Sequence, residues 1–173
     1  MAATDARPSI DRLKQAFNSV EVDISVSARD ILDRDLLSKS DPKCVLYTKR
    51  LGSQDFVKFD ETEEIMNNLN PTFVKKFRLT YFVGEKQELL FKLYDVDGFS
   101  GKDFLGEVTC LLSDIYRQQR LERPLVYNEN KKRKSGALIL HAFKVGDCKD
   151  QVRFNFKAEE IPKMDPLGQR TLT

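Results

Sequence analysis

The stretch that decides the fold is Val20-Glu-Val-Asp-Ile-Ser-Val-Ser-Ala28, in which apolar and polar side chains alternate without a break. Strict alternation is typical of a β-strand with one buried face and one exposed face. Residues 112–120 have a helical pattern. Further strands are predicted, each bounded by turn residues, at 43–49, 55–59, 73–82, 88–95, 104–111, 122–127 and 137–145. The sequence therefore predicts an all-β fold, an eight-stranded antiparallel sandwich with a short helix between strands six and seven.

Size, charge and cysteine content limit the classes of function. The chain has 173 residues, which is enough for one domain with a full core. Its net charge is +2, so no overall field favours a nucleic-acid partner. Cys44, Cys110 and Cys148 show no metal-ligand spacing and are interpreted as free thiols in a reducing compartment, the first two as core residues. Without a signal peptide or a run of ~20 apolar residues, the protein is expected to be cytoplasmic, with peripheral membrane contact at most.

The two ends of the chain are expected to lie outside the sandwich. We interpret residues 1–18 as a flexible tail, 19–147 as the folded domain, and 148–173 as a linker with the incomplete start of a second copy. The second copy is inferred because the alternation at 152–158 matches that at 22–28 when shifted by 130 positions. Chance similarity of two amphipathic strands is the alternative. A lone strand cannot bury its apolar face, so the chain is expected to self-associate more than one ending near Lys149.

Five aspartates carry the candidate chemistry. Asp35 and Asp41 follow the first strand, and Asp95, Asp97 and Asp103 surround a later loop. Alternating strand directions place both loops at one end of the sandwich, where crowded carboxylates repel one another unless a cation is bound. Calcium prefers oxygen ligands, and we expect about two ions. Zinc is disfavoured because no Cys or His is nearby, and the spacing does not fit an EF-hand. The alternative is that all five are ordinary turn residues.

Short motifs in this order resemble C2 domains, most closely the first C2 domain of the copines. They are Ala28-Arg-Asp-Ile-Leu32, Leu37-Ser-Lys-Ser-Asp-Pro42, Asn67-Asn-Leu-Asn-Pro71, Asp95-Val-Asp97 and Asp103-Phe-Leu-Gly106. The resemblance implies the circularly permuted (type II) topology and places the five aspartates in the calcium-ligand positions. Copines carry two C2 domains and a von Willebrand A-like domain. We interpret the second C2 domain as breaking off at Asp165 with no A-like domain after it, which puts partner recruitment through that domain in doubt.

Apolar residues in the two aspartate loops indicate contact with lipid. Leu36 and Leu37 lie in the first loop and Phe99 in the second, where a solvated loop does not need them. We expect these side chains to enter the membrane interface once calcium has cancelled the negative charge of the loops. The alternative is that they fold back onto the loops.

Basic residues suggest two further lipid contacts. Lys76 and Arg78 share one face of the strand predicted at 73–82, and Lys58 on the preceding strand could join them in meeting phosphoinositide headgroups. A solvated outer face is the alternative. The run Lys131-Lys-Arg-Lys134 could contact anionic lipid, form a solvated turn or act as a nuclear-import signal.

Calcium-dependent binding to anionic phospholipids such as phosphatidylserine is the function that these features favour. It would move the protein from the cytosol to the plasma membrane or other anionic membranes. The alternative is a protein–protein adaptor in calcium signalling that does not bind lipid. Catalysis is not expected, because no general base, nucleophile or phosphate-gripping Arg stands beside the aspartates, and the only histidine, His141, is interpreted as structural.

Overall fold

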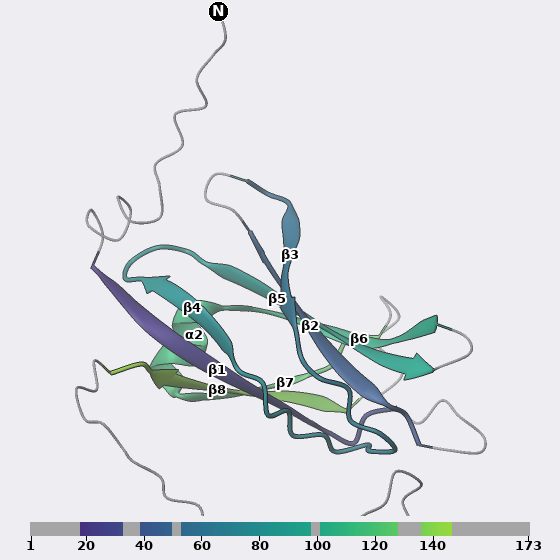
Figure 1. Ribbon diagram of the computed structural model, residues 1–173. Helices are drawn as coiled ribbons and strands as arrows, with labels where there is room; N and C mark the ends of the chain where they lie inside the picture. Colours follow the sequence, from purple (N-terminus) through teal and green to yellow (C-terminus); the bar gives the residue numbers. More distant parts are fainter. Residues whose placement is uncertain (1–17, 33–38, 50–52, 98–100, 128–135, 147–173) are drawn as a thin grey trace, which may run out of the picture.

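Two four-stranded antiparallel sheets pack face to face in the computed structural model, which describes residues 18–32, 39–49, 53–97, 101–127 and 136–146 (Figure 1). One sheet has the order β4-β1-β8-β7 and the other β3-β2-β5-β6. The predicted all-β sandwich is confirmed, and so is the short helix between β6 and β7. The elements are β1 (Ser19–Arg29), β2 (Pro42–Lys49), β3 (Phe56–Glu61), β4 (Phe77–Phe82), β5 (Glu88–Asp97), β6 (Gly101–Leu111), α2 (Leu112–Gln118), β7 (Arg120–Pro124) and β8 (Ala137–Lys144).

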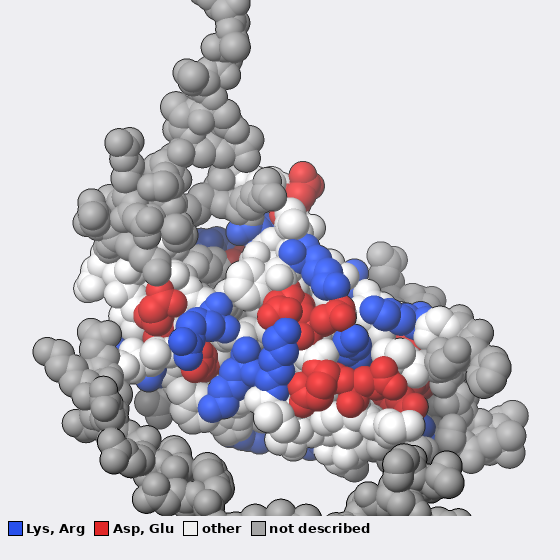
Figure 2. Space-filling view, viewed as in Figure 1, with Lys and Arg blue, Asp and Glu red and all other residues white. Residues whose placement is uncertain are grey.

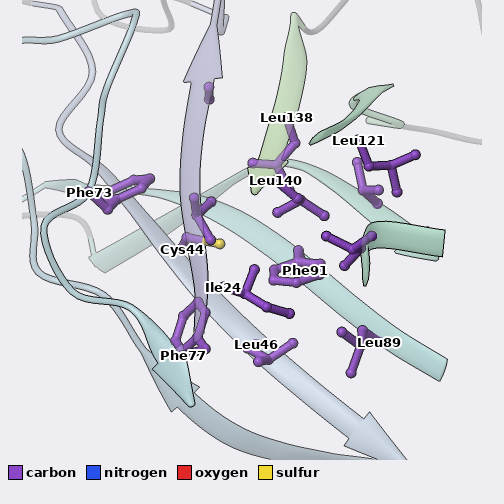
Figure 3. Packing of buried hydrophobic residues seen from close by; sticks show 14 of the residues in the cluster. Ile24, Cys44, Leu46, Phe73, Phe77, Leu89, Phe91, Leu121, Leu138 and Leu140 are labelled. Carbon is purple, nitrogen blue, oxygen red and sulfur yellow. The ribbon is translucent and has the colours of Figure 1, made fainter. Parts of the chain in front are cut away.

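The core lies between the two sheets and follows directly from the alternating pattern. Every second residue of β1 from Val22 to Ala28 is at most 4% exposed, whereas the residues between them are partly exposed. Phe77 on β4 and Phe91 on β5 meet across the core with ring centroids 6.3 Å apart. Figure 3 shows side chains from both sheets pointing into this space, among them the fully buried Cys44. The core position predicted for Cys44 is therefore confirmed.

Strand order brings the first and last strands of the sandwich together. β1 lies between β4 and β8 and is antiparallel to both, with Ala28 opposite Leu138. In the other sheet, β2 begins where β5 ends, since Pro42 is opposite Asp95. The end of β1 and the start of β2 consequently lie at the same end of the sandwich as the junction of β5 and β6. This end, here called the aspartate end, carries the candidate site.

Two predicted strands extend three or more residues beyond the observed ones. The strand predicted at 73–82 begins at Phe77, because the carboxylate of Glu63 accepts hydrogen bonds from the N–H groups of Val74 and Lys75. The strand predicted at 122–127 is β7, which ends at Pro124. Beyond it the chain crosses to the other sheet, where Val126 forms a bridge with Glu107 of β6. In both places a contact with a residue distant in the chain ends the strand that the local pattern suggests.

Candidate metal centre

Neighbouring strands bring three of the five candidate aspartates to one end of the sandwich. Asp95, near the end of β5, is opposite Pro42 on one side and Asp103 of β6 on the other. Asp41 immediately precedes β2, Asp95 lies on β5 and Asp103 lies on β6, and these three strands are adjacent in the sheet. The backbone register therefore brings these three residues to the same end of the sandwich. Asp97 is the last residue of β5, and its side chain, like the whole of Asp35, lies outside the described part of the chain.

Hydrogen bonds fix two of these carboxylates in place. Asp95 is only 1% exposed, and its Oδ1 accepts the backbone N–H of Asp41 at 2.6 Å. Oδ1 of Asp41 accepts the N–H of Asn67, also at 2.6 Å. The N–H of Val96 donates in turn to the carbonyl of Asp41 at 3.0 Å. An ionised carboxylate has about four acceptor positions, so both side chains keep oxygen lone pairs for a cation.

The connection between β3 and β4 also lies at the aspartate end, and this placement was not predicted from the sequence. Hydrogen bonds run from Ile65 N to Pro42 O at 3.1 Å, from Asn68 N to Ser40 O at 3.0 Å, and from Ile31 N to Leu69 O at 3.1 Å. Asn67 has a φ of 52°, in the left-handed region that Asn tolerates better than most residues. The paired asparagines at 67 and 68 belong to the C2-like motif at 67–71. They were the one feature of the sequence that could have indicated that this connection lies at the aspartate end.

Within the described residues, no group of three or more His, Cys, Asp or Glu side chains is arranged to hold a metal ion. Asp41 and Asp95 are joined by a hydrogen bond from the N–H of Asp41 to the carboxylate of Asp95. The side chain of Asp103 is exposed. A hard cation such as calcium needs six to eight oxygen ligands. Of the five candidate ligands, the structure describes the side chains of Asp41, Asp95 and Asp103, and Asp35 and Asp97 are the remaining candidates.

The two basic candidates lie on the outer face of the β4-β1-β8-β7 sheet, and neither is isolated. Arg78 donates two hydrogen bonds to Asp23, from Nε to Oδ1 at 2.8 Å and from Nη2 to Oδ2 at 2.9 Å. This contact lowers the pKa of Asp23 and balances the charge of Arg78. The ammonium of Lys76 lies 5.2 Å from the ring centroid of Phe143. Of the two, Lys76 keeps the more available charge.

Lys58, which was expected to extend this basic cluster, lies on β3 in the other sheet. Its ammonium is 2.7 Å from Oε2 of Glu61. Figure 2 shows the wider pattern: on the face in view, basic and acidic side chains alternate instead of forming a single positive area. Lys58 therefore does not join Lys76 and Arg78 in one basic patch.

The structure describes only some of the other residues that the sequence singles out. Leu36, Leu37, Phe99 and the run 131–134 lie outside the described residues. Burial raises the pKa of the Cys110 thiol to about 12, so this partly buried cysteine stays protonated at neutral pH. His141 is half-buried on β8 and stacks on Phe143, with ring centroids 6.3 Å apart. No described helix is long and apolar enough to cross a membrane.

Comparison with known proteins identifies the family. The profile of the C2 domain matches residues 19–127, and the chain belongs to the C2 domain family. Its relatives include nicotinic receptor-associated protein 1 of Caenorhabditis elegans and that of Caenorhabditis briggsae, each 31% identical over 178 aligned positions. The alignments cover 86% of this chain but only 28% of either relative, so the chain corresponds to a little over a quarter of their length.

Solved structures with a similar fold include several isolated and tandem C2 domains. The C2A domain of plant extended synaptotagmin 1 has a TM-score of 0.58 at 19% identity, covering 72% of this chain and 93% of that one. BON1-C2B has a TM-score of 0.56 at 20% identity, covering 82% of this chain and all (100%) of that one. The calcium-bound C2A and C2B domains of extended synaptotagmin 2 have a TM-score of 0.52 at 22% identity, covering 72% and 45%. At these identities the likeness concerns the fold.

Proposed function

We propose that the aspartate end binds calcium and, through it, anionic phospholipid membranes. The observation that carries this proposal is the placement of Asp95, which is buried between Pro42 and Asp103 and holds the N–H of Asp41. A buried carboxylate beside further carboxylates costs folding free energy unless charge is supplied, and calcium is the cation that oxygen-rich loops of this kind prefer. Membership of the C2 family, whose neighbours include a calcium-bound pair of domains, supports the same assignment.

Charge explains how calcium would control membrane binding. Before binding, the carboxylates of Asp41, Asp95 and Asp103 repel anionic headgroups. Once the carboxylates are neutralised, the same surface can approach a negative membrane, and open ligand positions can accept phosphate or carboxylate oxygens of lipids. Lys76, on the outer face of its sheet, could add a weak attraction of about 1 kcal/mol near such a surface.

Within the C2 family, we place the chain with the copines on the strength of the motifs around Asp41 and Asp103. The proposal further includes about two calcium ions, with Asp35 and Asp97 completing the ligand set, and no catalytic activity. Calcium would then shift the protein from the cytoplasm to anionic membranes such as the plasma membrane. Leu36, Leu37 and Phe99 remain the proposed lipid-contacting residues of the two loops.

Co-sedimentation with phosphatidylserine-containing vesicles, in calcium and in chelator, tests the proposal. Asp103→Asn is the informative variant because Asp103 is exposed and its replacement leaves the core intact. Asp55→Asn is the matched control, since it removes the same charge from an exposed residue at the opposite end of the sandwich. We expect calcium-dependent sedimentation that Asp103→Asn weakens and Asp55→Asn leaves unchanged.

Other outcomes would favour different functions. Calcium binding without vesicle binding would support the protein–protein adaptor. Vesicle binding that is equal in calcium and in chelator would remove calcium from the mechanism and direct attention to Lys76 and the run 131–134. Equal loss in both variants would show only a non-specific dependence on charge.

A further inference from the structure

A side chain from the β4–β5 connection occupies the outer edge of β4, which is an end strand of its sheet (Figure 1). Oε1 of Gln87 accepts the backbone N–H of Phe82 at 2.8 Å, and Nε2 of Gln87 donates to the carbonyl of Thr80 at 2.9 Å. An amide that accepts from one residue of a strand and donates to another takes the place of a peptide group of a neighbouring strand. The carbonyl of Gln87 also accepts the N–H of Leu112 at 2.9 Å, which holds this residue beside β4.

The two groups that Gln87 contacts point away from β1. The N–H of Val83 donates to the carbonyl of Asn18, the residue before β1, at 2.8 Å. Successive residues of a strand direct their backbone groups to opposite sides, so those of Phe82 and Thr80 face the outer edge of the sheet. The Gln87 amide therefore covers groups that a further strand would need in order to pair with β4.

Other edge strands in the described part of the chain are protected in different ways. The edge of β6 is covered because Glu107 and Val126 exchange two backbone hydrogen bonds, each of 2.9 Å. β3 has a register shift against β2 and carries the exposed Lys58, and β7 ends at Pro124. Bulges, lysines and prolines are devices that stop edge strands from pairing with other chains. β4 pairs with β1 without a register shift, so its protection depends on Gln87.

We propose that the outer edge of β4 is a strand-pairing surface for a second copy of this chain, and that the amide of Gln87 keeps it closed. In an antiparallel pair with its twofold axis at Thr80, each Thr80 faces its own copy, and Arg78 faces the partner's Phe82. No like charges are then opposite each other, whereas an axis at Arg78 would oppose two guanidinium groups. This pairing uses the carbonyl of Thr80 and the N–H of Phe82, the two groups that Gln87 occupies. It does not involve the aspartate end and so goes beyond the proposed function.

Sedimentation velocity of the full chain tests the role of Gln87. Gln87→Met keeps the length of the side chain and removes both hydrogen bonds. We expect dimer formation at least about tenfold stronger than in the unmodified chain, with an unchanged far-UV circular dichroism spectrum. Gln118→Met is the matched control, because it removes an amide from an exposed residue of α2, and it should sediment as the unmodified chain does. Association through residues 152–158 would be common to all variants and cancels in the comparison.

Disulfide trapping tests the surface and its register. Residues opposite each other in a hydrogen-bonded antiparallel pair have Cα atoms about 5.5 Å apart, which is within the range of a disulfide. Thr80→Cys, made together with Cys148→Ser, should form cross-linked dimers under mild oxidation when Gln87→Met is also present. It should form few when Gln87 is retained. Lys58→Cys in the same Gln87→Met background is the control, since it places an exposed thiol on the edge strand of the other sheet.

Three results would overturn the inference. Equal association of Gln87→Met and the unmodified chain would show that the amide does not close the edge. Stronger association without preferential cross-linking at Thr80→Cys would assign the contact to another surface. Equal cross-linking at Thr80→Cys with and without Gln87 would show an edge that is already open. If Gln87→Met loses the circular dichroism spectrum of the folded chain, Gln87→Asn takes its place in both experiments, because its shorter amide cannot reach β4.

Discussion

At the scale of single residues, Asp95 is the position at which fold and proposed function meet. Its carboxylate is almost fully buried, yet it accepts the N–H of Asp41 and lies opposite Asp103 in the sheet. Buried carboxylates are rare in proteins unless they are paired or bind a cation. The residue therefore organises the backbone of the aspartate end, and in the proposed function its remaining oxygen lone pairs bind calcium.

Replacement of Asp95 by asparagine should separate these two roles. The amide oxygen can still accept the N–H of Asp41, so the free energy of unfolding in chelator should change by less than about 1 kcal/mol. Calcium affinity should fall by at least about tenfold, because a charged ligand becomes neutral. Urea unfolding and a calcium titration on the same protein measure both. Loss of stability with unchanged calcium affinity would assign Asp95 a purely structural role.

Phe91 carries a prediction about the core. It is fully buried and contacts Phe77 across the two sheets. Phe91→Ala should lower the free energy of unfolding by about 3–5 kcal/mol, because it removes apolar contacts and leaves a cavity. Phe143→Ala, which truncates a side chain that is 49% exposed on the outside of β8, should cost less than about 1 kcal/mol. Similar losses of unfolding free energy for the two variants in chemical denaturation would contradict the placement of Phe91 in the core.

At the scale of elements, ion pairs connect the strands of the β3-β2-β5-β6 sheet across its outer face. Glu61 on β3 contacts Lys43 of β2 at 2.8 Å and Lys58 at 2.7 Å. Glu88 on β5 contacts Lys49 of β2, and Lys86 at 2.6 Å. The hydrogen bonds from Lys43 and Lys58 lower the pKa of Glu61 to about 2, and those from Lys49 and Lys86 do the same for Glu88.

These shifts predict how stability depends on pH. Each folded-state pKa lies below the ordinary value of 4.5, so the stabilisation is present above that pH and is lost as the pH falls towards about 2. The free energy of unfolding, measured by urea at a series of pH values, should decline over this window. Glu61→Gln should make the decline shallower. Glu64→Gln, at an exposed residue of the β3–β4 connection, should reproduce the original curve; a shallower curve for it alone would contradict the assignment.

The strand limits also show which parts of the fold could be predicted from the sequence. The alternation from Val20 to Ala28 predicted β1 correctly, because period-two burial is a local property of a two-sheet core. The start of β4 and the end of β7 were misplaced, because Glu63 and the bridge between Val126 and Glu107 are contacts between residues distant in the chain. Local patterns carry no information about such partners.

The same limit applies to the candidate site. Strand alternation was enough to place Asp41, Asp95 and Asp103 at one end. The hydrogen bond from Asn67 to Asp41 depends on how the β3–β4 connection crosses between the sheets. Only the tertiary structure determines that crossing.

At the scale of the whole molecule, the proposed site links calcium binding to stability. A ligand that binds only the folded state stabilises it by RT ln(1 + [L]/Kd), about 2.7 kcal/mol for one site at a hundredfold excess over Kd. Thermal unfolding should therefore occur at a higher temperature in calcium than in chelator. Asp103→Asn should reduce this difference, and Asp55→Asn should retain it. An equal unfolding temperature with and without saturating calcium would contradict a site confined to the folded state.

The central claim, that the aspartate end is a calcium site, is tested most directly by calorimetric titration of calcium into the unmodified chain and into Asp103→Asn. The account predicts saturable binding of about two ions per chain, weakened in Asp103→Asn and unchanged in Asp55→Asn. Absence of saturable binding to the unmodified chain, or identical binding by the unmodified chain and Asp103→Asn, would contradict it.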